Sequence, residues 1–406
     1  MFLNIPSPLR YTDPWSIGQE QRMRQLLAQD RRIAYFYERP DTSTFRYRAM
    51  NPGLTLAANP GCGVSGAWFD HQDLATDDSF LDSADALVIC RTRYNAAVAS
   101  MIARARARRL PVLFDCDDLV FDTRRLHLLV DSLNQDPHSE TVWNDWFASI
   151  GRIGATLRLC DGFITTNAFL AARAREYMPQ LSTAVMPNYL FQGQQELSEG
   201  LHQIKRDGGW RRDGHIHVGY FSGSPSHARD FAVAAPAILR LMERDPRIIL
   251  RIVGFLDPSQ ELMRFRDRIE FHPLQDFMNL QRLIAEVEIN IAPLQDNTFT
   301  NCKSELKFFE AAICGTLTLA TPTFTFRNSI RHGETGYLVP AYGWDAALQE
   351  AVALVEDTDR YAAIAEAAST QVRADYGWDR QAQTIVEAVF GQIGRSAQPA
   401  DISLPA

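Results

Sequence analysis

Short runs of consecutive apolar residues alternate with amphipathic stretches along most of this chain. The runs Ala86–Cys90 and Pro111–Asp115 predict buried strands, and the amphipathic stretch Tyr94–Arg108 between them predicts a helix. A strand, a helix and a strand joined by short connections form a βαβ unit, which makes the two strands parallel. The alternation continues with a helix at 143–158 and with strands at 162–165 and 182–186.

A second series of the same kind begins at His215. It predicts strands at 216–221, 248–253, 269–272, 288–292 and 316–320, and helices at 230–244, 277–287 and 301–314. Gly315 is expected to end the last of these helices at its C′ position. The chain is helical again from Trp344, with a break at 376–378. Two such series predict an α/β protein with two Rossmann-like parallel-sheet domains, whose strand ends face a cleft.

The length of 406 residues also favours two domains, because one hydrophobic core rarely extends so far. Residues 191–214 contain clustered glycines and few recurring apolar residues, which predicts a linker. The expected parts are an N-terminal domain at 1–190, the linker at 191–214, a C-terminal domain at 215–375, a helix at 376–394 that packs back on the N-terminal domain, and a disordered tail at 395–406.

The composition is globular, with 46% hydrophobic and 22% charged residues. No stretch approaches the roughly 18 apolar residues of a membrane span, and the first residues lack the apolar core of a secretory signal. The net charge of −8 argues against general nucleic-acid binding, although Arg104–Arg109 forms either a solvated helix end or a patch for acidic headgroups. The six cysteines show no CxxC spacing, so neither a disulfide nor a zinc site is predicted. We expect a cytoplasmic protein with at most peripheral contact at the inner face of a membrane.

Two segments before the first series suggest a function at first sight. Gly61–Gly66 matches GxGxxG, but its flanking residues do not form the strand and helix that a dinucleotide site requires, so a turn into a strand is favoured. Arg46 and Arg48 follow an earlier predicted strand, at Ile33–Tyr37. They lie either in a polar loop or in a loop that faces a ligand.

Polar side chains also follow the strands of the first series. Asp115, Asp117 and Asp118 stand at the end of one predicted strand, and Asn167 follows another. Ligands of open parallel sheets bind at the carboxyl ends of the strands. Paired carboxylates there could orient acceptor hydroxyls, act as a base or hold Mg²⁺. The alternative is a helix cap with a buried, hydrogen-bonded aspartate.

A small glycine turn follows the first strand of the second series. Such a turn leaves backbone amides free at a helix N-terminus, where they can bind an anion. The candidate anion-binding residues are Gly223, Ser224, His227 and Arg229.

The predicted helix at 301–314 carries a carboxylate in an unusual place. Glu310 lies beside an apolar stripe that includes Ile313, and Lys303 and Lys307 lie on its flank. A carboxylate beside a core is costly without a partner or a ligand. Glu310 therefore indicates a binding site.

Two segments of the second series resemble known motifs. Phe309–Thr316 (FEAAICGT) and Gly333–Val339 (GETGYLV) resemble the Glu-Ala-x-x-x-Gly-x-Pro segment and the later glycine turn of GT-B glycosyltransferases, specifically those of family 4. Tyr220–Ser224 with His227 and Asp230, and in the first half Arg46–Arg48 and the Asp-x-Asp-Asp cluster at 115–118, look like a subset of bacterial members that build surface polysaccharides. The resemblance spans most of residues 40–390.

The resemblance implies a metal-independent, retaining transfer of a sugar from a nucleotide-diphospho-sugar to a saccharide or glycolipid acceptor. In the family, a glutamate on this helix binds the ribose hydroxyls, which maps onto Glu310. Two basic residues stabilise the leaving diphosphate, and Lys303, Lys307 and Arg229 are the candidates. The acceptor side would comprise Arg46, Arg48, Asp115, Asp117, Asp118 and Asn167. No cofactor is expected besides the donor substrate; Mg²⁺ could bind the carboxylates but is not expected.

One position departs from the family pattern. Cys302 stands eight residues before Glu310, where the family has a glutamate that meets the transferred sugar. The backbone of Asn301 and Cys302 would contact the sugar instead, with amide donors from the start of the helix. If the reaction inverts configuration, Asp117 or Asp118 becomes the candidate general base.

Two other functions stay open. A nucleotide-sugar epimerase of the same fold would need no acceptor, and a binding or scaffold protein that has lost catalysis would fit the missing glutamate. The sequence does not specify the nucleotide base, the sugar, the acceptor, the linkage or the oligomeric state.

Overall fold

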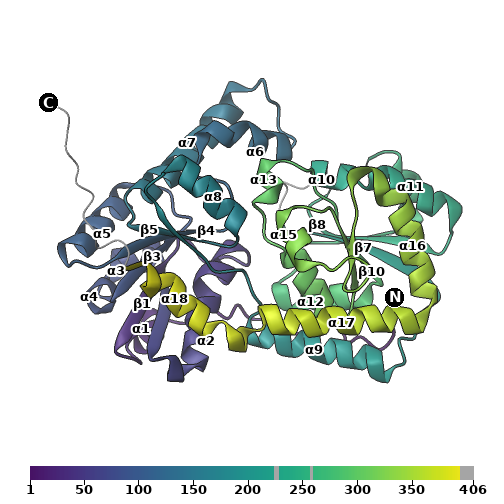
Figure 1. Ribbon diagram of the computed structural model, residues 1–406, viewed down its shortest axis with the longest axis horizontal. Helices are drawn as coiled ribbons and strands as arrows, with labels where there is room; N and C mark the ends of the chain where they lie inside the picture. Colours follow the sequence, from purple (N-terminus) through teal and green to yellow (C-terminus); the bar gives the residue numbers. More distant parts are fainter. Residues whose placement is uncertain (224–227, 257–258, 394–406) are drawn as a thin grey trace. The chain divides into compact units, whose positions relative to one another are not determined.

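The computed structural model describes residues 1–223, 228–256 and 259–393. Within these residues the strands form two parallel sheets of six strands each, and helices flank both sheets (Figure 1). The strand orders are β2-β1-β3-β4-β5-β6 and β12-β11-β10-β7-β8-β9. The predicted α/β fold with two Rossmann-like sheets is confirmed, while the cleft between them stays a prediction.

The first sheet consists of strands whose side chains are mostly buried on both faces. Its strands are β1 (Arg31–Phe36), β2 (Val64–Phe69), β3 (Ala86–Cys90), β4 (Val112–Cys116), β5 (Gly162–Thr165) and β6 (Ser182–Val185). The helices along this part of the chain are α1 (Gln19–Leu26), α2 (Asn51–Ala58), α3 (His71–Thr76), α4 (Phe80–Ser83), α5 (Ala96–Ala107), α6 (Leu126–Ser132), α7 (Glu140–Arg158) and α8 (Ala168–Tyr177). Because helices cover both faces of a parallel sheet, its strands appear in the sequence as continuous apolar runs.

The second sheet is built in the same way. Its strands are β7 (Ile216–Ser222), β8 (Ile248–Gly254), β9 (Ile269–His272), β10 (Ile289–Ala292), β11 (Leu317–Ala320) and β12 (Tyr337–Leu338). The helices are α9 (Gln192–Asp207), α10 (Ala228–Ala232), α11 (Ala235–Arg244), α12 (Phe277–Glu286), α13 (Thr298–Asn301), α14 (Leu306–Ala312), α15 (Phe324–Ser329), α16 (Trp344–Glu356), α17 (Thr358–Tyr376) and α18 (Ala382–Ile393). Single turns of 3₁₀ helix lie at 60–62, 123–125, 341–343 and 378–380, and a longer one at 262–268.

The chain divides into two compact units, and neither is a continuous segment. One unit contains Met1–Asp13, Arg125–Trp146 and Asn188–Trp378, and the other contains Pro14–Arg124, Phe147–Pro187 and the chain from Asp379. The last helix, α18, packs against β6 and α2 of the unit that holds the first sheet. The predicted tail at 395–406 lies outside the described residues.

The segment predicted as a linker contains a long helix. Residues 192–207 form α9, which packs against α12. Its inward face carries Gln194, Ser198, His202 and Lys205, all of them buried. These positions recur every three or four residues, as on any packed helix, but their side chains are polar. A search for apolar periodicity therefore misses this helix.

The segment around Arg46 and Arg48 is not a loop. Residues 46–50 form one turn of π-helix that leads into α2, and all five residues are buried. The GxGxxG segment forms a short helical turn at 60–62 followed directly by β2, as predicted. No helix within the described ranges is both long and apolar enough to cross a membrane.

Candidate active site

The carboxyl edge of the second sheet brings several predicted residues together. Strand β7 ends at Ser222, β10 ends at Ala292, and α14 lies against β10 and β11. Helix α14 stops where Gly315 adopts a left-handed φ of 66°, as its position after the apolar stripe predicts. The predicted helix at 301–314 is divided, because α13 ends at Asn301 and α14 begins only at Leu306.

Glu310 lies on α14 among buried side chains. Its residue is only 4% exposed, and its Oε1 accepts a hydrogen bond from Gln194 Nε2 at 3.2 Å. The sequence argument required a partner or a ligand for this carboxylate, and α9 supplies one partner. A carboxylate has about four acceptor positions, so this bond leaves acceptor capacity on Glu310.

Lys307 lies one turn before Glu310 on the same side of the helix. Its Nζ donates a hydrogen bond to the carbonyl oxygen of Phe221 at the end of β7, and lies 5.2 Å from the centre of the Tyr220 ring. Burial lowers the pKa of Lys307 to about 8, while Asp230 and Glu310 act in the opposite direction. The ammonium group therefore stays mainly charged at neutral pH.

Asp230 extends this cluster of charges from α10. Its side chain is buried, and its Oδ1 accepts a hydrogen bond from the amide of Gln295 at 3.0 Å. The negative charge of Asp230 favours the charged form of Lys307. Lys303 lies on the connection between α13 and α14, where its Nζ is 4.7 Å from the centre of the Phe299 ring.

The start of the predicted helix does not offer the amide donors that we expected. The amides of residues 301, 302 and 303 each donate within the α13 turn, at 3.1 Å to the carbonyl oxygens of residues 297, 299 and 300. The Cys302 side chain is fully buried. The Asn301 side chain bonds Asp296 Oδ1 and the amide of Phe324. The predicted role of this backbone as a sugar contact therefore lacks its physical basis.

Of the residues predicted to bind an anion after β7, the structure describes Gly223, which is exposed, and Arg229. Ser224 and His227, predicted to bind the donor, lie outside the described residues. Arg229 forms an ion pair with Asp131, and its Nε donates to Asn134 Oδ1 at 3.2 Å. Because both partners of the ion pair are about 41% exposed, solvent screens it and an anion could compete for the arginine.

At the edge of the first sheet, two of the predicted acceptor residues form a buried pair. Arg48 Nε and Nη2 donate to the two carboxylate oxygens of Asp115 at 2.7 and 2.8 Å, and Nη1 donates to the carbonyl oxygen of Met186 at 2.7 Å. Both side chains are 0% exposed. This pair therefore ties the π-turn to β4 and does not face an acceptor. Arg46 is also buried, with its guanidinium over the Tyr47 ring.

Asp117 lies in a more accessible cluster after the end of β4. Its Oδ2 accepts a hydrogen bond from Thr44 Oγ1 at 3.1 Å, and Arg91 Nη1 lies 3.4 Å from its Oδ1. Asp118 is partly buried and accepts a bond from the amide of Leu119. Asn167 caps α8 by accepting from the amide of Leu170, which is the helix-cap alternative for such a residue.

Sequence reasoning missed three residues of these clusters: Gln194, Arg91 and Thr44. Arg91 follows β3 directly, just as Asp117 follows β4, so its position after a strand was a usable indication. The polar repeat on α9 was the indication for Gln194. Nothing in the local sequence pairs Thr44 with Asp117, because the fold brings them together across 73 positions.

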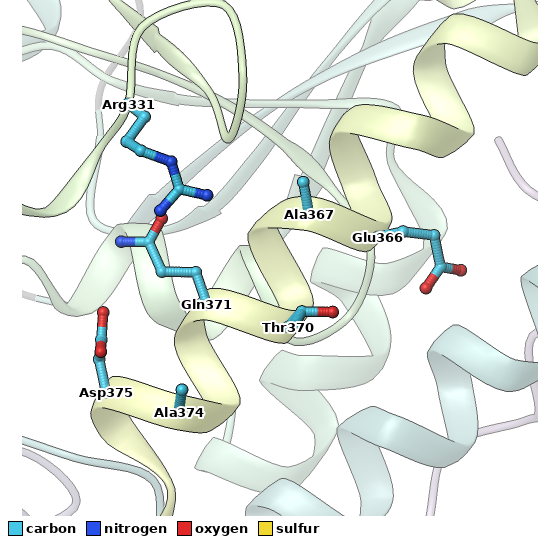
Figure 2. Close-up of a pocket in the computed structure, with 7 residues that line it drawn as sticks. All are labelled: Arg331, Glu366, Ala367, Thr370, Gln371, Ala374 and Asp375. Atoms are coloured by element: carbon cyan, nitrogen blue, oxygen red, sulfur yellow. The ribbon is translucent and has the colours of Figure 1, made fainter.

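A separate pocket lies along α17. It has a volume of about 530 Å³ and is lined by Arg331, Glu366, Ala367, Thr370, Gln371, Ala374 and Asp375 (Figure 2). None of the predicted donor or acceptor residues lines it. In the part of the chain that the structure describes, no group of three or more His, Cys, Asp or Glu residues is arranged to hold a metal ion.

Comparison with known proteins places this geometry in context. Residues 215–357 match the family model described as "Glycosyl transferases group 1". This match confirms the prediction that the chain is an enzyme of the glycosyltransferase class. A comparison with curated protein sequences gives no significant match.

Several solved structures are similar in fold. WaaG, a glycosyltransferase involved in lipopolysaccharide biosynthesis, is similar with a TM-score of 0.58 and 13% identity over 88% of this chain and 99% of its own. HepE from Anabaena, solved with UDP, is similar with a TM-score of 0.56 and 14% identity over 87% and 98% of the two chains. Sucrose-phosphate synthase from Thermosynechococcus elongatus is similar with a TM-score of 0.53 and 15% identity over 89% of this chain and 98% of its own. The fold is GT-B.

Proposed function

We propose that the protein transfers a sugar from a nucleotide-diphospho-sugar to a saccharide or glycolipid acceptor, as a glycosyltransferase of the family 4 type in cell-surface polysaccharide synthesis. The observation that carries the proposal is the Glu310–Lys307 pair, one turn apart on α14 at the carboxyl edge of the second sheet and inside the matched residues. HepE has been solved with UDP and UDP-glucose, and WaaG is described as acting in lipopolysaccharide biosynthesis, which supports both parts of the proposal.

In this proposal the two side chains divide the recognition of the donor. Glu310 accepts hydrogen bonds from the ribose hydroxyls, and Lys307, with Lys303, neutralises the diphosphate. As the bond between the anomeric carbon and the diphosphate oxygen breaks, negative charge grows on the leaving diphosphate. A preorganised ammonium in a partly buried site stabilises that charge more strongly than water does. This step needs no metal ion, and we propose that the transfer is metal-independent and retaining.

The acceptor is proposed to bind at the edge of the first sheet, beside Asp117. This carboxylate is held by Thr44 and Arg91 and is 16% exposed, so it can accept a hydrogen bond from a sugar hydroxyl. The acceptor hydroxyl forms the new glycosidic bond, and its proton passes to the departing diphosphate. Arg48 and Asp115 support this edge from within the protein.

The proposal is tested by titrating UDP, GDP and ADP into the wild-type protein and into Glu310→Gln. Hydrogen bonds to a charged group contribute about 1.5–3 kcal/mol, so Glu310→Gln should weaken the preferred nucleotide roughly 10- to 100-fold. Glu334→Gln is the matched control, since this exposed glutamate forms a solvent-exposed ion pair with Arg331 and lies in the same domain. The melting temperatures of both variants without nucleotide show whether the fold is retained.

Turnover separates the proposed activity from the other two functions. A wild-type protein that converts the nucleotide-sugar without any acceptor would indicate an epimerase. Tight nucleotide binding with neither transfer nor donor hydrolysis, across a panel of saccharide acceptors, would indicate a binding or scaffold protein. An unchanged nucleotide affinity in Glu310→Gln would remove the ribose role of Glu310.

A further inference from the structure

A closed ring of hydrogen bonds surrounds Glu310 and joins α9, α12 and α14. Gln194 Nε2 donates to Glu310 Oε1 at 3.2 Å, and Gln281 Nε2 donates to the Glu310 carbonyl oxygen at 3.1 Å. Gln281 Nε2 also donates to Ser198 Oγ at 2.7 Å, and Ser198 Oγ donates to the Gln194 carbonyl oxygen at 2.6 Å. The ring therefore fixes both the main chain and the carboxylate of Glu310.

The ring lies in a fully enclosed environment. Gln194, Ser198 and Gln281 are each 0% exposed. Buried hydrogen bonds of this kind are costly to leave unmade, so the side chains are held in one arrangement. The Gln194 side chain is thus enclosed and bonded to Glu310 before any ligand binds.

Helix α9 is itself anchored near both of its ends. Next to Gln194, the Gln195 Oε1 accepts a hydrogen bond from the amide of Trp378 at 3.2 Å. Eleven residues after Gln194, Lys205 Nζ donates to the Gly315 carbonyl oxygen at 3.2 Å and to Thr316 Oγ1 at 2.9 Å, just beyond the end of α14. Helix α9 therefore cannot shift without breaking these bonds.

From this geometry we infer that Gln194 is a positioning residue for the nucleotide-binding carboxylate of Glu310; the inference rests on the proposed function. A neutral amide orients the carboxylate without neutralising it, whereas a lysine or arginine at this position would form a salt bridge and compete with the ligand. A carboxylate has about four acceptor positions, so the bond from Gln194 still allows Glu310 to accept from a ribose diol. Holding Glu310 in place in advance reduces the entropy lost when the nucleotide binds.

The test compares the binding of nucleotides that carry the ribose hydroxyls with the binding of a nucleotide that lacks them. Gln194→Met keeps the length of the side chain and removes the amide, and Gln203→Met is the matched control, because Gln203 on the same helix bonds only the exposed Asp207. Calorimetry is run with UDP, GDP and ADP, and then with the 2′,3′-dideoxy form of the nucleotide that binds best. We expect Gln194→Met to weaken the ribonucleotide about tenfold and to leave the dideoxy nucleotide unchanged. The double variant with Glu310→Gln should bind no more weakly than Glu310→Gln alone.

A second variant keeps the test decisive if Gln194→Met does not fold. Gln194→Glu preserves shape but places two carboxyl groups together, which then share a proton. The ribonucleotide affinity of Gln194→Glu, divided by that of the wild type at the same pH, should be low at pH 8 and approach one as the pH falls towards 5.5.

Three outcomes would overturn the inference. Equal loss of affinity for the ribonucleotide and its dideoxy form would show a purely structural role for Gln194. Wild-type affinity in Gln194→Met would remove the role altogether. If the wild type bound none of the nucleotides, the donor role of Glu310 and the inference would both fall, whereas the first two results leave the donor role intact.

Discussion

The buried ion pair between Arg48 and Asp115 gives the sharpest test of what the edge of the first sheet is for. Asp115→Asn removes the negative charge and leaves the Arg48 guanidinium, at 0% exposure, without the carboxylate that accepts two of its hydrogen bonds. Breaking a buried pair from one side costs about 3–5 kcal/mol. For a domain of this size, each kcal/mol lowers the melting temperature by about 2–4 °C, so we expect a decrease of about 6–20 °C.

The assay is thermal unfolding followed by circular dichroism, on Asp115→Asn and on the double variant Arg48→Met/Asp115→Leu. Replacing both charges by apolar groups of similar volume is close to neutral, so the double variant should recover most of the lost stability. A normal melting temperature in Asp115→Asn, together with reduced transfer to acceptors, would refute this reasoning. It would return Arg48 and Asp115 to the acceptor site that the sequence suggested.

Three further predictions concern Lys307 and Asp117. Because burial lowers the pKa of Lys307 to about 8, the affinity of the wild type for UDP should fall as the pH rises from 7 to 9, by up to about tenfold per pH unit above the pKa. Lys307→Met should bind UDP weakly at every pH. A wild-type affinity that does not change with pH would contradict this prediction. The same shift means that the folded protein releases this proton before the unfolded chain does, so the unliganded protein should gain stability between about pH 8 and 10.5. Asp117→Asn should lower turnover and leave donor affinity unchanged, measured by steady-state kinetics and calorimetry; an equal fall in donor affinity would assign Asp117 to the donor side or to the fold.

Most strands were predictable because their burial is two-sided. The run Ala86–Cys90 is β3 without any change of boundary, and Ile216–Phe221 is β7 to within one residue. A strand covered by helices on both faces must be apolar throughout, so its sequence identifies it. Gly315 was predictable for a different reason, since its left-handed φ is one that glycine adopts without strain.

The parts that the sequence did not reveal are buried polar contacts between distant segments. Arginine side chains are mostly exposed in proteins, so the residue type alone predicts that Arg48 is exposed. Its burial is explained by its partner Asp115, 67 positions away in the sequence. Helix α9 escaped because its packed face carries Gln194 and Lys205 in place of leucine or valine. Cys302 shows the reverse case: it occupies a position that the family pattern gives to a glutamate, yet the fold uses it as a core residue.

The order in which the ribosome makes this chain is at odds with the order in which its two units are completed. Helix α18 packs against β6 and α2, so the first sheet gains part of its cover only after the whole second sheet has been synthesised. Phe2, made long before that sheet, packs against Trp210 and Tyr361 in the unit that holds it. The unit that holds the first sheet therefore cannot finish folding until the other unit has been translated. Apolar surface on the early sheet stays exposed throughout synthesis, and shielding it from aggregation falls to the cell.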